Sequence, residues 1–290
     1  MKWEWVLFGG GYYILALAFL YIAKVTFDII TPYSLKEEVV DKENPAVSLA
    51  LTGYLGGVMA VLSGIFIGGN GAVEAPLDAA RFFSDLQSMS LFAFAGMAAL
   101  ALAGIVSDRI IMPHFSVANE LTEHRNLGVG FMTAATYIGS GIVIAGGLHG
   151  SADPRGFVIA FVLGQIFLVG FAFIYRLLSI KDALPQLGQR RNTAVGIAWG
   201  GATIAYAIVL MAGLGYGDNS ADGWELRLIH FIYYAVLGII LLPISRWVGA
   251  RFFIYGTHLN VKIIQHGSVG AASIKAGLSI LSALALVFSF

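Results

Sequence analysis

Asn44-Pro45-Ala46-Val47-Ser48 opens a long apolar segment, and modified copies of it recur three times along the chain. Each copy has a polar opener, a valine in the fourth position and a small residue after it. The later copies are Asn126-Leu127-Gly128-Val129-Gly130, Asn192-Thr193-Ala194-Val195-Gly196 and His266-Gly267-Ser268-Val269-Gly270. Repetition on this scale predicts four copies of one structural unit. We expect the copies to occupy about residues 1–70, 71–150, 151–217 and 218–290 of a single transmembrane domain.

The composition is typical of a membrane protein. Of the 290 residues, 58% are hydrophobic and only 12% are charged, whereas soluble domains have about 25% charged residues. The chain has no cysteine, which excludes disulfides and cysteine-ligated metal sites. Basic and acidic residues balance at 17 each, so no surface for nucleic acid is expected. We therefore expect the lipid bilayer to surround most of the chain.

Eight segments are apolar enough to span a bilayer, which requires about 20 helical residues. They cover residues 5–27, 46–69, 89–111, 127–148, 156–178, 193–214, 226–248 and 268–289. The first is expected to be a span and not a secretory signal, because it is long and no small-residue cleavage site follows it. The sequence thus predicts an all-α polytopic membrane protein with eight transmembrane helices, arranged as four repeated helix pairs.

Glycines four residues apart recur on the second helix of the pairs, as in Gly53 with Gly57 and Gly196 with Gly200. Residues with this spacing lie on one helix face, where small side chains allow two backbones to approach closely. Glycine is also common in membrane helices in general. We favour the packing interpretation, in which the second helices form the inner surface and the first helices face lipid.

The distribution of lysine and arginine predicts the orientation of the chain. The links within the pairs contain twelve of these residues, namely Lys24, Lys36, Lys42, Arg109, Arg125, Arg176, Lys181, Arg190, Arg191, Arg246, Arg251 and Lys262. The opposite side contains four, namely Lys2, Arg81, Arg155 and Arg227. By the positive-inside rule the links face the cytoplasm, so both termini are expected on the non-cytoplasmic side.

A second polar residue lies six positions before each polar opener, namely Glu38, Glu120, Gln186 and Asn260. One interpretation is that these residues and the openers form a ring that binds a cation or a lipid head group at the cytoplasmic interface. The other, which we favour, is helix capping. Asparagine is a preferred N-cap, and glutamate is stabilised near a helix N-terminus.

Charged residues also end the first helix of each pair. Asp28 and Asp108 take this place in the first two pairs, and Arg176 and Arg246 take it in the last two. These charges either pair across the bundle or extend separately toward water at the membrane interface. The spacing does not decide between the two arrangements.

Lys275 is the strongest single candidate for a functional residue. It lies nine residues after His266, about 13 Å along the eighth span. The repeat frame aligns it with Gly53, Ala135 and Gly201 of the other copies. A charge at this depth is costly unless it is paired or hydrated. We expect either an ion site near Lys275 and His266, or a lysine that extends back to the head groups.

Part of this pattern resembles a known family. Asp28, Thr31-Pro32, Glu38 and the stretch from Asn44 to Tyr54, followed by a glycine-rich helix, are similar to the YjfL-like family of bacterial inner-membrane proteins (domain of unknown function 350). The resemblance covers nearly the whole chain, with a more divergent second half. It implies a place in the bacterial cytoplasmic membrane and a link to membrane-stress proteins. It provides no catalytic residues.

No nucleophile with its base, and no metal-ligand cluster, is visible in the sequence. We therefore expect no enzyme activity, no metal and no cofactor. The first functional hypothesis is a scaffold or sensor in envelope or membrane stress, acting as a homo-oligomer or with a cytoplasmic membrane-stress protein on its basic face. The alternative is a channel or transporter for a small ion or polyamine, which Lys275 and the ring of polar residues favour.

Overall fold

The computed structural model describes residues 3–67, 79–149, 153–180, 182–215, 224–253 and 259–289. Every regular element in these ranges is helical, and eight of the helices are long and apolar enough to cross a membrane. The prediction of an all-α polytopic protein is confirmed. The long helices are α1 (Trp3–Ile30), α2 (Pro45–Ile67), α3 (Ala79–Val106), α5 (Leu127–Leu148), α6 (Pro154–Leu178), α8 (Thr193–Gly215), α9 (Trp224–Phe253) and α11 (Val269–Ser289).

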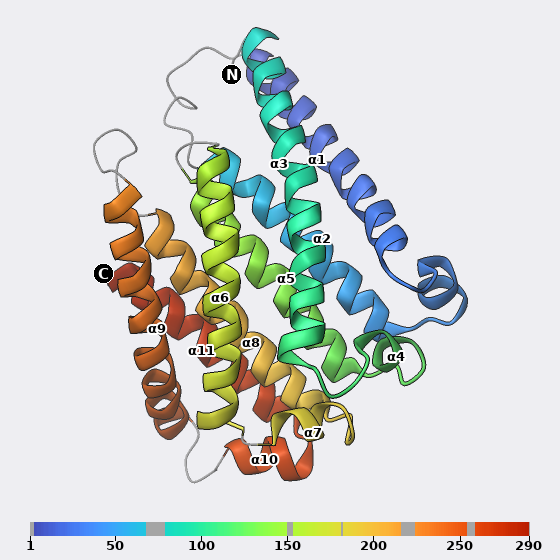
Figure 1. Cartoon of the computed structure of the whole chain (residues 1–290), viewed down its shortest axis with the longest axis vertical. Coiled ribbons are helices and arrows are strands. Elements are labelled where there is room, and N and C mark those ends of the chain that lie inside the picture. The colour runs from blue at the N-terminus through green and yellow to red at the C-terminus, as the bar shows by residue number, and fades with distance from the viewer. Residues whose placement is uncertain are drawn as a thin grey trace.

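Consecutive long helices form the pairs α1–α2, α3–α5, α6–α8 and α9–α11, and short helical links join the two members of each pair. The links contain η1 (Lys36–Asp41), η2 (Ser107–Ile111) with α4 (Val117–Thr122), α7 (Ala183–Leu187) and α10 (Leu259–His266). Figure 1 shows α4, α7 and α10 gathered at the lower end of the bundle. We call the end formed by η1, α4, α7 and α10 the link end.

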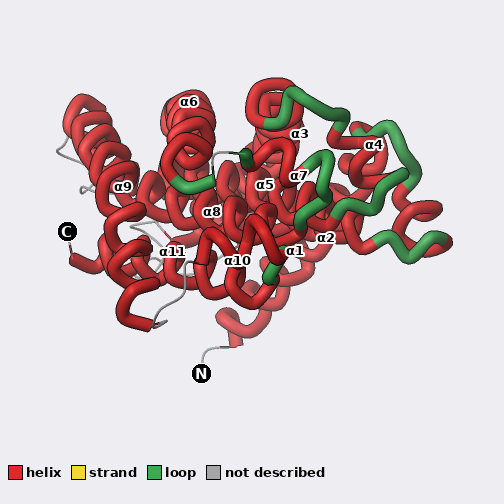
Figure 2. The backbone as a smooth tube through the Cα atoms, turned by 90° about the horizontal axis from the view of Figure 1, so that it is seen from below, coloured by secondary structure: helices red, strands yellow, loops and turns green. Residues whose placement is uncertain are grey.

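The second helices of the pairs form a row in the order α2, α5, α8 and α11, each in contact with the next. Three of the first helices lie over the junctions of this row, and α1 contacts α2 and α3 at its end. Helix α3 contacts α2 and α5, α6 contacts α5 and α8, and α9 contacts α8 and α11. Figure 2 shows the row with α3, α6 and α9 along one side of it. The protein is therefore an array of two layers.

Glycine lets the helices of the inner row touch through their backbones. A Cβ atom added to Gly53 would collide with the backbone of Ala134, and one added to Gly141 would collide with the backbone of Gly57. Such close approach stabilises helix association in lipid through van der Waals contacts. The predicted division of roles is confirmed for the central pairs. Of the span residues, 78% are buried in α5 and α8, whereas 44% are buried in α3 and 28% in α6, the first helices of the same two pairs.

Candidate functional site

Asn126 connects three segments at the link end. Its Nδ2 donates hydrogen bonds to Glu120 Oε2 and to the carbonyl oxygen of Leu187, both at 2.8 Å. Its Oδ1 accepts the backbone N–H of Val129 at 3.2 Å. One side chain thus caps α5, holds the preceding link and binds the link of the next pair. We call this arrangement an amide bridge, formed by an asparagine cap, the polar residue six positions earlier and a carbonyl of the next link.

The first pair has the same amide bridge. Asn44 Nδ2 donates to Glu38 Oε2 and to the carbonyl oxygen of Leu121, both at 2.8 Å. Its Oδ1 accepts the backbone N–H of Ala46 at 3.0 Å. Leu121 directly follows Glu120 in the chain. The first amide bridge therefore binds the link that carries the second one.

The third amide bridge continues the series with a neutral partner. Asn192 Nδ2 donates to the carbonyl oxygen of Ile263 at 2.9 Å and, over a longer 3.4 Å, to Gln186 Oε1. Its Oδ1 accepts the backbone N–H of Ala194 at 3.1 Å. All three asparagines are helix caps, which confirms the interpretation favoured from the sequence.

Cations from two successive pairs surround the buried carboxylate of Glu38, which is 3% exposed. Lys42 of the same link donates to Glu38 Oε1 at 2.7 Å, and Arg125 of the next pair acts on it through its charge. Burial on its own raises the pKa of Glu38. The hydrogen bonds from Lys42 and Asn44, together with the two positive charges, outweigh burial and lower the pKa below its ordinary value.

Glu120 has the same surroundings one pair later. His124 Nδ1 lies 2.9 Å from Glu120 Oε1, and Arg191 Nε lies 3.8 Å from Glu120 Oε2. Arg125 and Arg191 each directly precede the bridging asparagine of their own pair, with φ near +50°. In the fourth pair Gly267 has this backbone conformation. In the third pair the polar residue is the neutral Gln186, and the residue of the next pair at the position of Arg125 and Arg191 is Gly267, which has no side chain.

The fourth pair has no bridging asparagine. Ser268 caps α11, because its Oγ accepts the N–H of Ala271 at 3.3 Å. Its N–H donates to the carbonyl oxygen of Lys262, six residues earlier, as the N–H groups of the three asparagines do in their own links. The alignment that placed His266 at the cap is therefore wrong by two residues. His266 is exposed at the end of α10, which is longer than the other short link helices.

Asp28 and Asp108 bind backbone groups of the links. Asp28 Oδ1 accepts the N–H of Leu35 at 2.8 Å, and Asp108 Oδ1 accepts the N–H of Val117 at 3.3 Å. In the described ranges neither carboxylate forms an ion pair with Arg176 or Arg246. Pairing across the bundle, one of the two arrangements considered from the sequence, is thus absent among these residues.

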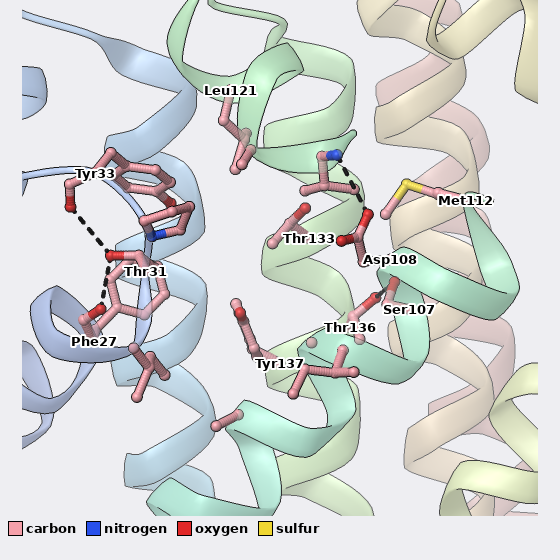
Figure 3. Close-up of a pocket in the computed structure, with 17 residues that line it drawn as sticks. Phe27, Thr31, Tyr33, Ser107, Asp108, Met112, Leu121, Thr133, Thr136 and Tyr137 are labelled. Atoms are coloured by element: carbon pink, nitrogen blue, oxygen red, sulfur yellow. Dashed lines mark hydrogen bonds between the residues drawn. The ribbon is translucent and has the colours of Figure 1, made fainter. Parts of the chain in front are cut away.

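A cavity of about 160 Å³ lies beside Asp108, between the link-end parts of α1, α3, η2, α4 and α5. Figure 3 shows Tyr33, Asp108, Thr133 and Tyr137 around it. Thr133 Oγ1 is buried and has no hydrogen-bond partner among the described residues. Because one water occupies about 30 Å³ in the liquid, the cavity has room for a few waters or a small polar molecule. Lys275 is not among its lining residues.

Lys275 lies elsewhere, in a buried cluster with Arg246 and Tyr175. Lys275 Nζ donates to Asn260 Oδ1 at 2.7 Å and is 5.4 Å from the centre of the Tyr175 ring. Arg246 Cζ is 5.1 Å from the centre of the same ring. Both cationic residues are 7% exposed. Lys275 is thus buried among the helices, and its ammonium group reaches a neutral acceptor in the link of its own pair. The choice between an ion site and a lysine that extends back to the head groups stays a prediction.

The family model described as Domain of Unknown Function (DUF350) matches residues 6–148 and, a second time, residues 150–290. The chain belongs to the DUF350 family. No curated protein and no solved structure matches it. The resemblance seen in the sequence is confirmed, and the two DUF350 units correspond to α1–α5 and α6–α11.

Equivalent positions of the two DUF350 units relate the cavity to the cation cluster. Phe27 and Tyr175 each lie 17 residues before the bridging asparagine of their pair. Thr133 and Lys275 each lie seven residues after the cap of the last helix in their unit. Phe27 and Thr133 line the cavity of the first unit. Tyr175 and Lys275 therefore lie where the second unit would have the equivalent of this cavity. The side chains of Lys275 and Arg246 occupy that place.

Sequence reasoning found Lys275 and the amide-bridge residues but missed the arginines that act on them. A signal for Arg125 and Arg191 was present in the sequence, because each directly precedes a bridging asparagine and follows a pair with a buried glutamate. The pair that follows the neutral Gln186 has Gly267 at the same position. Arg246 is 29 residues from Lys275 in the chain. No local spacing could place those two side chains on one tyrosine ring.

Proposed function

We propose that this DUF350 protein is a non-enzymatic scaffold or sensor of the bacterial cytoplasmic membrane, which holds a membrane-stress protein at its link end. The observation that carries the proposal is the series of amide bridges. Asn44 binds the link of the second pair, Asn126 that of the third and Asn192 that of the fourth. Bonds in series keep the four links in a fixed arrangement, as a docking platform requires.

The packing of the inner row supports a rigid body. A Cβ added to Gly196 would collide with the backbone of Gly128, and one added to Gly146 with the backbone of Met211. Helices in backbone contact leave no room for a solute between them. These contacts favour a scaffold over a pore that runs between the inner helices of one protomer.

Charge at the link end supports a cytoplasmic partner with an acidic surface. Lys36, Arg109 and Arg190 are exposed there. The positive-inside rule favours a cytoplasmic position for this end. Complementary charges steer partners together and select among them.

Site-specific crosslinking in cells tests the proposal. A photoreactive amino acid at Gln189, which is exposed at the link end, should form an adduct with one cytoplasmic protein under membrane stress. The matched control carries it at Arg155, exposed at the opposite end of α6. The adduct at position 189 should be lost in R190E and retained in R155E. If both positions give the same adducts, or R190E has no effect, the scaffold proposal is wrong.

The orientation is tested separately, with a reporter fused to the C-terminus. We expect alkaline phosphatase activity, which requires export, and no fluorescence from a reporter that matures only in the cytoplasm. The reverse result would place the link end outside the cell. A cytoplasmic partner would then be excluded.

Transport of a small cation or polyamine is the second candidate function, and the cavity beside Asp108 favours it. A carboxylate, a free threonine hydroxyl and two tyrosines around about 160 Å³ are suited to a hydrated amine. Uptake of labelled putrescine into proteoliposomes that is lost in D108N would support this candidate over the scaffold. Equal uptake into protein-free liposomes would exclude it.

A further inference from the structure

Buried polar atoms without partners concentrate in the second DUF350 unit. Of the four buried side-chain atoms in the described ranges that lack a hydrogen bond of good geometry, three belong to one cluster, namely Tyr175 Oη, Trp199 Nε1 and Arg246 Nη1. The Tyr175 hydroxyl and the Arg246 guanidinium are close enough to interact with each other, but neither supplies a negative charge. The Tyr175 and Trp199 rings stack with their centres 6.1 Å apart, and both residues are almost fully buried. Buried donors are nearly always hydrogen-bonded in native proteins. The cluster therefore lacks an acceptor.

The same cluster also lacks negative charge. Lys275 donates to the neutral Asn260, and Arg246 donates to the backbone of Leu242 at 3.2 Å and to Ser179 Oγ at 3.4 Å. None of the ion pairs in the described ranges includes Lys275 or Arg246. The two cations share one aromatic ring and repel each other. A ring quadrupole does not compensate two buried charges.

The cluster lies near the surface of the membrane. Ser179 follows the last residue of α6, and Asn260 is exposed at the start of α10. Both belong to the link end, where Asn260 Nδ2 donates to the carbonyl oxygen of Ser179 at 3.1 Å; Figure 1 shows the lower end of α6 and α10 at this end of the bundle. A group at this depth is within reach of lipid head groups as well as of dissolved ions.

We propose that Lys275, Arg246, Trp199 and Tyr175 bind one phosphate group, supplied by a lipid head group or by free phosphate. The guanidinium is planar and suited to an oxyanion, and the ammonium, indole and phenol groups add donors for further oxygens. The phosphate supplies the missing acceptor and the missing negative charge together. The first unit has Thr133 and Phe27 at the positions of Lys275 and Tyr175, so it forms no such site. This proposal does not depend on the scaffold function.

Thermal unfolding of the full-length protein in nanodiscs tests the site and identifies the source of the phosphate. Nanodiscs of digalactosyldiacylglycerol, an uncharged bilayer lipid that contains no phosphate, serve as the reference. Phosphatidylglycerol in the disc tests a lipid head group, and inorganic phosphate added to the reference disc tests a free ion. The effective source should raise Tm by roughly 5 °C. Chloride at equal ionic strength should leave Tm unchanged, and an equal effect of chloride would overturn the assignment to phosphate.

Two variants and one control separate binding from a structural role. K275M should lose the dependence on phosphate or phosphatidylglycerol and should melt at or above the wild-type Tm in the reference disc, because it removes an uncompensated buried charge. W199F removes one donor with little change in shape and should weaken the dependence. R176M changes a partly exposed arginine next to Tyr175 and should retain the full dependence. If wild type responds to neither source, or K275M responds as wild type does, the site is excluded.

Discussion

Lys275 of the second DUF350 unit occupies the position of Thr133 in the first, seven residues after the cap of the unit's last helix. Both residues are 7% exposed. Thr133 borders a cavity with its hydroxyl free of partners, and Lys275 donates to Asn260 beside a second cation. The same fold thus carries a neutral polar cavity in one unit and a cationic cluster in the other. Functions that depend on single residues are expected at these two places.

The free hydroxyl of Thr133 gives the first prediction. Replacing a buried polar group that has no partner with an apolar group of the same shape is neutral or stabilising, by up to about 1 kcal/mol. T133V should therefore keep or raise the Tm of the purified protein. Thr136 is the matched control, since its Oγ1 donates to the carbonyl of Met132 and lies 3.2 Å from Ser107 Oγ. T136V should lower stability by about 1 kcal/mol. Equal losses in both variants would mean that Thr133 has a partner in the cavity.

The amide bridges give the second prediction. N126A removes a helix cap, leaves the buried Glu120 carboxylate without its amide donor and breaks the bond to Leu187. The loss should be about 3 kcal/mol or more. N192A removes the equivalent contacts from the neutral Gln186 and should cost about 1–2 kcal/mol. Tm in one detergent ranks the variants, and a larger loss in N192A than in N126A would contradict the role assigned to the buried carboxylate.

The sequence was sufficient for the fold because its strongest signals are local. Apolar segments of spanning length, glycines four residues apart and an asparagine at the start of the second helix in three of the four pairs all lie within single elements. The acceptors of the amide bridges lacked such a signal, because Leu121 and Leu187 contribute only backbone carbonyls. The fourth repeat was misaligned because its Val269 and Gly270 lie two residues closer to the helix cap, Ser268, than the valine and the small residue do in the other copies.

The candidate site could be predicted only in part for the same reason. The depth of Lys275 follows from its distance to the helix start, so it was visible in one segment. Its neighbours Tyr175 and Arg246 come from α6 and α9. Their meeting depends on how whole helices pack. The cavity beside Asp108 likewise depends on five elements, and no composition pattern marks it.

Glycine contacts in the inner row give the third prediction. A Cβ at Gly141 would collide with the backbone of Gly57, which cannot move without separating α2 from α5. G141A should therefore abolish the folded, monodisperse protein in size-exclusion chromatography. Gly277 of α11 has open space around its Cα. G277A should keep the wild-type profile and gain up to about 1 kcal/mol from higher helix propensity. A normal profile for G141A would exclude backbone contact between α2 and α5.

Glu38 gives a prediction for the dependence of stability on pH. Its pKa is lowered in the folded protein, mainly because the hydrogen bonds from Lys42 and Asn44 outweigh burial. A group whose pKa is lower when folded stabilises the protein above its unfolded pKa, about 4.3 for glutamate. That contribution is lost as the pH falls through the folded pKa. Tm measured from about pH 7 to about pH 3 should therefore fall more steeply in wild type than in E38Q, which cannot titrate. K42M removes one donor and should shift the loss to higher pH. A slope in E38Q as steep as that of wild type would show that other groups cause the acid sensitivity.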